Sequence, residues 1–281
     1  MYSKKSNTTE WKSKLNIKIS ALSPVPIFGI SRHRISIDGK GVTTLVTFQG
    51  CPLHCRYCLN DICHNAADNM QHYTPESLYQ KVGIDNLYFI ATHGGVCFGG
   101  GEPLLRVDFI KAFRELAGKG WGLTVETSLN VPLSQVEAVS EVVDDYIIDI
   151  KDCNPEIYKA YTDCDNAQVM QNLKWLVEHV GQEHLMVRVP HIPNYNTPED
   201  VARSIAQLRE MGIETIDEFE YVDNLTNFGI FANIRFRRRS NGDTRFGKSR
   251  NDLRDTSAVF TGKNCNIGIG YFSFYRFFLV D

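Results

Sequence analysis

The sequence predicts an α/β fold built on a parallel sheet. Six short apolar segments alternate with segments of helical periodicity between residues 43 and 222. Threonine–proline pairs mark helix starts, and polar residues follow the ends of the apolar segments. Such alternation is typical of parallel strands joined by helical crossovers. The strands are expected at 43–49, 96–98, 123–127, 146–151, 185–189 and 213–222.

The helices expected between these strands are indicated by their start signals and apolar stripes. One begins near Thr74, which can cap it, with Pro75 in the first turn and Glu76 at the positive end of the dipole. Thr197 and Pro198 mark another start, for a helix that ends near residue 211. Apolar residues at helical spacing predict further helices at 107–117, from 132 onward and at 166–179.

Length and composition favour a soluble cytoplasmic protein. A chain of 281 residues can bury a substantial core in one domain. No apolar run approaches the roughly 18 residues of a membrane span, so no membrane partner is expected. The lysines near the start are not followed by an apolar stretch typical of a signal peptide. We therefore expect the eight cysteines to be reduced.

The last part of the chain differs in character from the rest. Residues 223–281 carry ten basic and five acidic side chains, although the whole chain has a net charge of −3. No apolar stripe continues there, so we predict a lead at 1–34 that is partly disordered, a core domain at 35–222 and a divergent or frameshifted tail at 223–281. The basic run at 235–250 could suggest nucleic-acid binding. A solvated, disordered segment is the favoured interpretation, and no nucleic-acid partner is expected.

Three cysteines lie close together just after the first expected strand. Cys51, Cys55 and Cys58 have the spacing C-x3-C-x2-C within the segment 49–60. Thiolates select iron–sulfur centres, zinc or Cu(I) over hard cations. Three cysteines on a four-iron cluster leave one iron without a protein ligand, and such an open position can bind a small molecule.

A zinc knuckle is the main alternative for these thiols. In that case Cys63, His54 or His64 would supply the fourth ligand. Otherwise Cys63 is a bystander outside the triad. The other cysteines show no pair spacing and are expected to behave as small apolar residues: Cys97, Cys153, Cys164 and Cys265.

A glycine run follows the second expected strand. Gly99, Gly100 and Gly101 precede Glu102 and a proline. Glycines let a backbone approach a ligand closely, and a carboxylate complements an ammonium group. A tight strand-to-helix turn with a glutamate at the helix start is the structural alternative. The position about forty residues after the triad favours a cofactor site.

The two motifs together resemble the radical S-adenosylmethionine (SAM) enzymes. The segments 37–42, 48–51 and 55–60 are similar to the activating enzymes of glycyl radical enzymes, the pyruvate formate-lyase activase group. The resemblance covers about residues 34–222 and implies a partial (β/α)6 barrel, open on one side. The divergent, irregular C-terminal tail at 223–281 lies outside the resemblance. The resemblance also implies one [4Fe–4S] cluster held by Cys51, Cys55 and Cys58, with SAM chelating the fourth iron.

The resemblance implies further contacts to SAM. Gly100, Gly101 and Glu102 would lie along its amino group, Tyr57 near adenine, Glu126 near the ribose, and Lys151 and Arg188 at the carboxylate. A monovalent cation is implied near Glu126 and Asp149. Lys151 and Asp149 could instead form an ordinary surface ion pair. The family's histidine after strand six is missing, because no histidine follows His191.

The implied activity is reductive cleavage of SAM followed by removal of hydrogen from a backbone glycine of a partner glycyl radical enzyme. Flavodoxin or ferredoxin is the expected electron donor. Two alternatives remain open at this point. The substrate could be a small molecule, as in the 7-carboxy-7-deazaguanine synthase type, or the chain could be an inactive iron–sulfur or zinc-binding scaffold.

Overall fold

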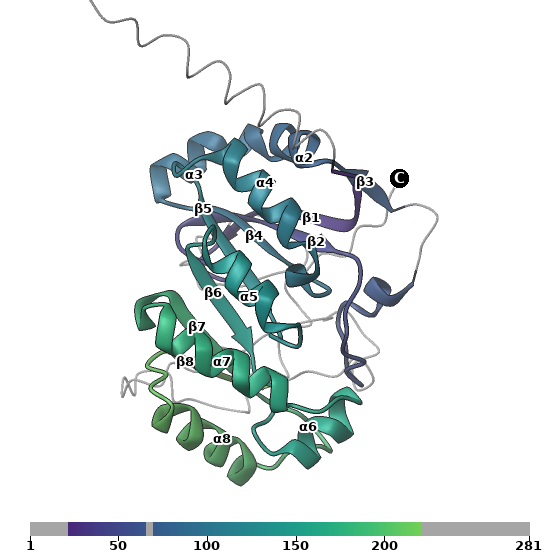
Figure 1. The fold of residues 1–281 in the computed structure, drawn as a ribbon, viewed down its shortest axis with the longest axis vertical. Coiled ribbons are helices and arrows are strands. Elements are labelled where there is room, and N and C mark those ends of the chain that lie inside the picture. The colour runs from purple at the N-terminus through teal and green to yellow at the C-terminus, as the bar shows by residue number, and fades with distance from the viewer. Residues whose placement is uncertain (1–21, 66–69, 221–281) are drawn as a thin grey trace, which may run out of the picture.

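The computed structural model describes residues 22–65 and 70–220, which share an eight-stranded sheet (Figure 1). The strand order is β3-β1-β2-β4-β5-β6-β7-β8. The strands are β1 Val25–Ile35, β2 Val42–Phe48, β3 Gln71–Tyr73, β4 Gly95–Gly100, β5 Gly122–Thr127, β6 Asp145–Asp149, β7 Leu185–His191 and β8 Ile216–Glu220.

Six strands run parallel to one another: β2, β4, β5, β6, β7 and β8. Each overlaps one of the six segments predicted from the sequence, so the expected parallel α/β architecture is confirmed. Among the described residues β3 and β8 lie at opposite edges of the sheet and do not pair with each other. This open arrangement is consistent with a partial barrel.

No strand was predicted before the first parallel strand, where the sequence suggested only a partly disordered lead at 1–34. Residues Val25–Ile35 form β1, which pairs antiparallel with both β2 and β3. The register of β1 against β2 shifts twice, and His33 within β1 has a φ of 57°. These irregularities break the alternation of apolar and polar residues by which a strand is recognised in a sequence.

Two of the helices begin where their threonine caps predict. Thr74 Oγ1 accepts a hydrogen bond from the Ser77 amide at 3.2 Å, and Thr197 Oγ1 accepts one from the Asp200 amide at 3.2 Å. The helices are α2 Pro75–Val82, α3 Asn86–Thr92, α4 Val107–Ala117, α5 Leu133–Ser140, α6 Pro155–Thr162, α7 Ala167–His179 and α8 Pro198–Glu210. Short 3-10 turns lie at Asp61–His64, Gly83–Asp85, Pro103–Arg106 and Gln182–His184.

Two of these helices, α3 and α6, were not predicted. Both are short, with seven and eight residues, and neither carries a typical aliphatic stripe. The side chains that α6 buries are Tyr158, Tyr161 and Thr162. Two tyrosines and a threonine at helical spacing do not stand out from a polar loop, although Asn154, which accepts from the Glu156 amide, and Pro155 mark the start of α6.

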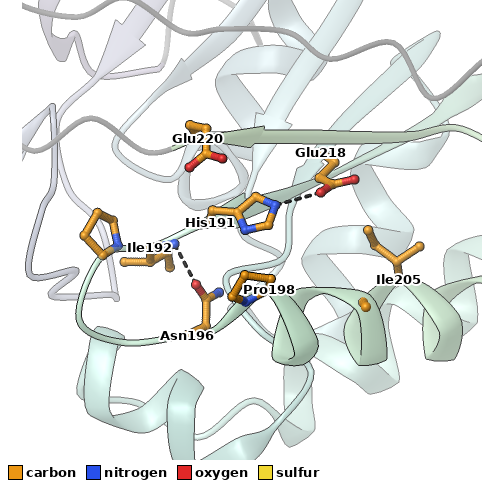
Figure 2. Close-up of a pocket in the computed structure, with 9 residues that line it drawn as sticks. His191, Ile192, Asn196, Pro198, Ile205, Glu218 and Glu220 are labelled. Atoms are coloured by element: carbon orange, nitrogen blue, oxygen red, sulfur yellow. Dashed lines mark hydrogen bonds and ion pairs between the residues drawn. The ribbon is translucent and has the colours of Figure 1, made fainter. Parts of the chain in front are cut away.

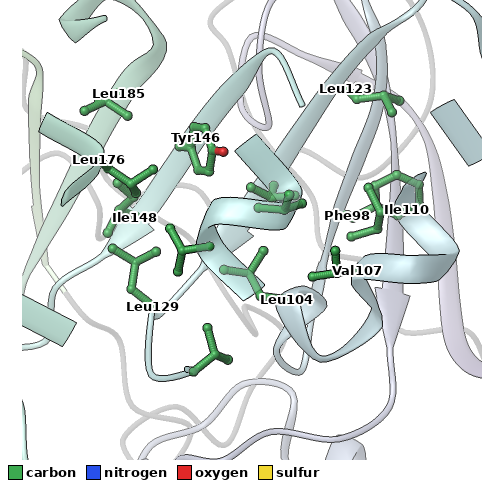
Figure 3. Close-up of a cluster of buried hydrophobic side chains, with 14 of the residues drawn as sticks. Phe98, Leu104, Val107, Ile110, Leu123, Leu129, Tyr146, Ile148, Leu176 and Leu185 are labelled. Carbon is green, nitrogen blue, oxygen red and sulfur yellow. The ribbon is translucent and has the colours of Figure 1, made fainter. Parts of the chain in front are cut away.

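The two faces of the parallel sheet differ in chemistry. Strand residues such as Phe98, Leu123 and Ile148 pack in one apolar cluster with α4, α5 and α7 (Figure 3). Along each strand, alternate side chains point to the opposite face. On that opposite face the strands carry polar residues, including Glu126 on β5 and Arg188 on β7. The apolar face therefore holds the fold together, and the other face is available for polar chemistry.

The predictions for residues 1–21 and 223–281 lie outside the described residues. They concern most of the expected lead and all of the expected divergent tail, including Cys265. Within residues 22–65 and 70–220, no helix is both long enough and apolar enough to cross a lipid bilayer.

Candidate functional site

The three predicted ligand cysteines lie in the loop that follows β2. Gly50 turns the chain there with a φ of 98°, and its amide donates to the carbonyl of Cys63 at 2.9 Å, which ties the two ends of the loop together. Cys51, Cys55 and Cys58 are partly buried, and none of them is in a disulfide. Burial raises the pKa of Cys55 to about 12, partly opposed by the nearby charge of Lys151.

Cys63, which the sequence suggested as the fourth ligand of a zinc knuckle or else as a bystander, lies against this group. Its thiol forms hydrogen bonds with the thiols of Cys51 and Cys58. These contacts lower the pKa of Cys51 and, as the largest influence, lower the pKa of Cys58 to about 7. The 3-10 turn Asp61–His64 folds Cys63 back into the loop. The only signal in the sequence was the short distance from Cys58.

The loop is also fastened to α6. The His54 amide donates to the carbonyl of Thr162 at 3.0 Å, and the Arg56 amide donates to the carbonyl of Tyr161 at 3.1 Å. These bonds fix the backbone on either side of Cys55. They depend on α6, a helix that was not predicted from the sequence.

The glycine run lies directly against the start of the cysteine loop. The Gly101 amide donates to the Phe48 carbonyl at 2.9 Å, and the Glu102 amide donates to the Gly50 carbonyl at 2.7 Å. A Cβ atom on Gly101 would lie only 2.1 Å from the Gly50 carbonyl oxygen. The Gly100 carbonyl accepts from Asn60 Nδ2 at 3.2 Å, so both motifs form one packed unit.

Glu102 is buried and its carboxylate is bonded within the protein. Oε1 accepts from the Leu104 amide at 3.2 Å and from Thr127 Oγ1 at 2.6 Å. Oε2 accepts from the Ser128 amide at 2.9 Å and from Ser128 Oγ at 2.7 Å. Burial still raises its pKa despite these four bonds. Glu102 therefore clamps the end of β4 to the end of β5.

Arg188 is buried at the centre of a charged network on the polar face of the sheet. Its Nη1 lies 2.5 Å from Glu126 Oε1, and its Nη2 donates to the Ile37 carbonyl at 2.9 Å. Asp217 on the neighbouring strand lies 3.7 Å from its Nε. Two carboxylates thus compensate a buried guanidinium, as a charge with little access to water requires.

Lys151 and Asp149 form a second ion pair just beyond the end of β6. Lys151 Nζ lies 3.2 Å from Asp149 Oδ2, and the two side chains are only 13% and 16% exposed. A solvated surface pair would be much more exposed. The pair lies in the electrostatic neighbourhood of Cys55, because the charges of both residues act on that thiol.

Tyr57 belongs to a cluster of three tyrosines. Its ring centroid lies 6.1 Å from that of Tyr161 on α6 and 5.6 Å from that of Tyr195 in the loop after β7. Its hydroxyl accepts from Asn194 Nδ2 at 3.2 Å. This cluster joins the cysteine loop to α6 and to the loop after β7.

A pocket of about 440 Å³ lies at the carboxyl ends of β7 and β8 (Figure 2). His191 Nε2 lies 2.7 Å from Glu218 Oε1 on one side of it, and Asn196 Oδ1 accepts from the Ile192 amide at 2.6 Å on the other. Ile192, Pro193, Pro198, Ala202 and Ile205 supply apolar surface to its walls.

The structure thus brings the predicted site residues to the carboxyl-terminal edge of the parallel strands, where chemistry is placed in such folds. The donor set fits an iron–sulfur cluster, because three free thiols share one loop beside a glycine backbone and an ion pair. Within residues 22–65 and 70–220, no three His, Cys, Asp or Glu side chains already converge as ligands of a single metal ion.

Comparisons with known proteins bear on the same residues. The family model described as the radical SAM superfamily matches residues 45–203. A pyruvate formate-lyase-activating enzyme of Clostridium pasteurianum is 30% identical over 189 residues, which cover 67% of this chain and 76% of that protein. A (2S)-3-sulfopropanediol dehydratase activating enzyme of Klebsiella oxytoca is 27% identical and covers 77% of this chain and 90% of its own length.

A similar fold is found among solved structures. The crystal structure of Streptococcus suis SuiB bound to precursor peptide SuiA aligns with a TM-score of 0.50 and 16% identity. The alignment covers 77% of this chain and 44% of SuiB. At this level of identity the likeness concerns the fold alone.

Proposed function

The chain belongs to the radical SAM superfamily, and on that premise we propose that it is the activase of a glycyl radical enzyme. Curated relatives named as activating enzymes cover two thirds or more of this chain, which supports the activase class. The observation that carries the proposal is the cysteine loop: three free thiols are held in one loop, packed against a glycine run at the carboxyl edge of the sheet.

Cys51, Cys55 and Cys58 are the proposed ligands of one [4Fe–4S] cluster, with SAM at the open iron. When bound, this group would supply the electron for reductive cleavage of SAM and so allow removal of hydrogen from a glycine. The protein's part is to orient SAM and to exclude water. Gly100, Gly101 and Glu102 are the proposed neighbours of the amino group of SAM, and Glu102 also holds their loop against Thr127 and Ser128.

The charged residues would receive the rest of SAM. Lys151 and Arg188 are the proposed partners of its carboxylate, and Tyr57 of its adenine. Glu126 and Asp149 are the proposed neighbours of the ribose and of a monovalent cation. This face carries three carboxylates, those of Glu126, Asp149 and Asp217, and two cations, Lys151 and Arg188. An additional cation is therefore electrostatically compatible with it.

The proposed partner is a glycyl radical enzyme whose glycine segment reaches the open side of the sheet. Flavodoxin or ferredoxin is the proposed electron donor. We place the protein in the cytoplasm, because reduced thiols and an oxygen-sensitive cluster need a reducing compartment.

Anaerobic reconstitution with iron and sulfide tests the proposal. We expect about four irons per chain, and 5′-deoxyadenosine when SAM and dithionite are added. Alanine at Cys51, Cys55 or Cys58 should lower the iron content and abolish nucleoside release. Cys153→Ala is the matched control, because its thiol bonds the Ser204 carbonyl away from the loop. Undiminished iron in all three triad variants contradicts the proposed ligation.

The substrate is tested separately. Mixing the reduced protein and SAM with candidate glycyl radical enzymes should give the doublet of a glycyl radical in the electron paramagnetic resonance spectrum. Nucleoside release without a radical in any partner would instead indicate a small-molecule substrate.

A further inference from the structure

The loop that follows β5 has an unfavourable backbone conformation at Leu129. Its φ is 59°, in the left-handed region that residues with a side chain rarely adopt. Leu129 is completely buried and belongs to the apolar cluster that also contains Leu176 of α7 (Figure 3). A residue persists in such a conformation only where its surroundings hold it there. The turn at Leu129 must therefore be held by other parts of the fold.

Asn172 on α7 holds this turn. It is completely buried, and its Nδ2 donates to the Leu129 carbonyl at 2.8 Å and to the Val131 carbonyl at 2.7 Å. Carbonyl oxygens only accept hydrogen bonds, so the group that faces both of them must be the NH2 of the side-chain amide. The Oδ1 atom is buried and has no hydrogen-bond partner among the described residues. An apolar side chain would avoid this unpaired oxygen, so the two donated bonds are what the asparagine contributes.

The same turn carries both hydroxyls that bind Glu102. The Leu129 amide donates to Thr127 Oγ1 at 2.9 Å, and this Oγ1 donates to Glu102 Oε1 at 2.6 Å. Ser128 Oγ accepts from the Asn130 amide at 3.4 Å and donates to Glu102 Oε2 at 2.7 Å. Each hydroxyl is thus oriented by an amide of the turn. The conformation of the turn therefore sets the position of the groups that hold the Glu102 carboxylate.

Glu102 connects the turn to the glycine run and to the cysteine loop. Its amide donates to the Gly50 carbonyl at 2.7 Å, and the Gly101 amide beside it donates to the Phe48 carbonyl at 2.9 Å. A continuous series of hydrogen-bonded residues thus leads from Asn172 to the junction of the two motifs. A displacement of the turn would be transmitted to that junction.

We propose that Asn172 is a positioning residue that acts through Glu102. By holding the turn after β5, it keeps Glu102 and the adjacent glycine run where SAM is proposed to bind. The effect on SAM rests on the proposed function. The effect on the loops rests on the hydrogen bonds alone, so the two can be tested separately.

Asn166 offers a matched control within the same chain. It is also a buried asparagine, and its Nδ2 donates to a backbone carbonyl, that of Cys153, at 3.0 Å. That bond holds the loop after β6 instead of the turn after β5. Asn172→Leu and Asn166→Leu therefore remove the same kind of bond from two different loops. Asn172→Ala, which introduces no new atoms, is the second variant if the leucine prevents folding, and the same results are expected of it.

The first experiment is hydrogen exchange in the metal-free proteins, measured by mass spectrometry. In Asn172→Leu we expect the amides of Ser128 and Leu129 to exchange about tenfold faster or more relative to amides of α4, which correct for any general loss of stability. The Leu104 amide, which donates to Glu102 Oε1 at 3.2 Å, should also exchange faster. The control variant should leave these rates unchanged. An unchanged rate at Leu104 in Asn172→Leu overturns the proposal, because Glu102 would then keep its place without the turn.

The second experiment measures 5′-deoxyadenosine release by the reconstituted proteins at several SAM concentrations. Asn172→Leu should raise the KM for SAM about tenfold while kcat per loaded chain stays near the wild-type value, because a displaced glycine run weakens binding. A lower kcat at an unchanged KM overturns the proposal, since a merely structural residue would reduce only the amount of active protein. If the wild type itself releases no nucleoside, the proposed function fails, and the exchange rates still decide the role of Asn172.

Discussion

Glu126 and Arg188 meet at 2.5 Å on the polar face of the sheet, although the strand β6 lies between their two strands. The pair is possible because both side chains point to the face that the helices leave uncovered, and Arg188 is only 3% exposed there. The pair holds the buried guanidinium of Arg188 near the proposed cofactor site. The contribution of the pair to stability can be measured without any cofactor.

Glu126→Gln should lower the free energy of unfolding of the metal-free protein by about 1–3 kcal/mol, because the negative charge of a buried ion pair is lost while Asp217 and the Ile37 carbonyl still compensate Arg188. Urea denaturation measures the change. Glu178→Gln is the control, since the Lys174–Glu178 pair is exposed and should contribute less than about 1 kcal/mol. Equal effects of the two substitutions would contradict the assigned network.

Gly101→Ala should disrupt the junction between the glycine run and the cysteine loop. The new Cβ would lie 2.1 Å from the Gly50 carbonyl oxygen, so the backbone must move, at a cost of about 1–3 kcal/mol or more. Thermal unfolding measures the loss, and reconstituted iron content should fall with it. Gly120→Ala is the control, because nothing lies within 4 Å of its Cβ position, and its stability should change by less than about 1 kcal/mol. A neutral Gly101→Ala would show that the two loops are not packed as described.

Asp85 should make the free energy of unfolding depend on pH in the acid range. Its carboxylate is fully buried and accepts from Arg32 Nε at 2.8 Å and from Thr44 Oγ1 at 3.0 Å. The Arg32 hydrogen bond holds the pKa of Asp85 below its usual value, so the folded state binds a proton less readily than the unfolded chain. The stabilisation is therefore complete above the unfolded pKa of about 3.9 and is lost as the pH falls through the folded pKa.

Asp85→Asn tests this pH dependence. The variant should be about 1–3 kcal/mol less stable than the wild type at pH 7. The difference should shrink as the pH falls toward about 3, because protonation then removes the charge from the wild type as well. Urea denaturation at several pH values measures both proteins. A difference that stays constant with pH would mean that the Asp85 charge makes no contribution.

Cys63→Ala separates the two metal hypotheses for the cysteine loop. If Cys51, Cys55 and Cys58 hold a four-iron cluster, Cys63 is not a ligand and the variant should keep the iron content of the wild type. In a zinc knuckle that uses Cys63 as the fourth thiolate, the variant should bind zinc much more weakly. Metal analysis of protein purified without oxygen distinguishes these outcomes. Iron loss in Cys63→Ala equal to that in Cys51→Ala would place Cys63 among the ligands.

Local sequence patterns predicted the parallel strands and the capped helices well. Thr74 and Thr197 indicated helix starts correctly, because a capping bond spans only three residues. The strand β1 was missed, since its two register shifts and the left-handed backbone at His33 obscure its alternation. Helix α6 was missed because its buried residues include two tyrosines and a threonine, although Asn154 and Pro155 mark its start locally.

The role of the Glu102 side chain is harder to predict from the sequence than its position. The sequence places a carboxylate after a glycine run, which indicates a ligand for an ammonium group. In the structure its oxygens accept from Thr127 and Ser128, about 25 residues away along the chain. No local pattern reveals such a contact, because it depends on the ends of β4 and β5 lying side by side.

The sequence by itself determined the order of strands and helices and the spacing of the three thiols, because periodicity, capping and short spacing are local properties of a chain. The tertiary structure alone decided that Cys63 lies against Cys51 and Cys58, and that α6 fixes the backbone around Cys55. It also decided that Glu126 pairs with Arg188. Those contacts join segments that meet only when the sheet has its register and its crossovers, and register is a property of the whole fold.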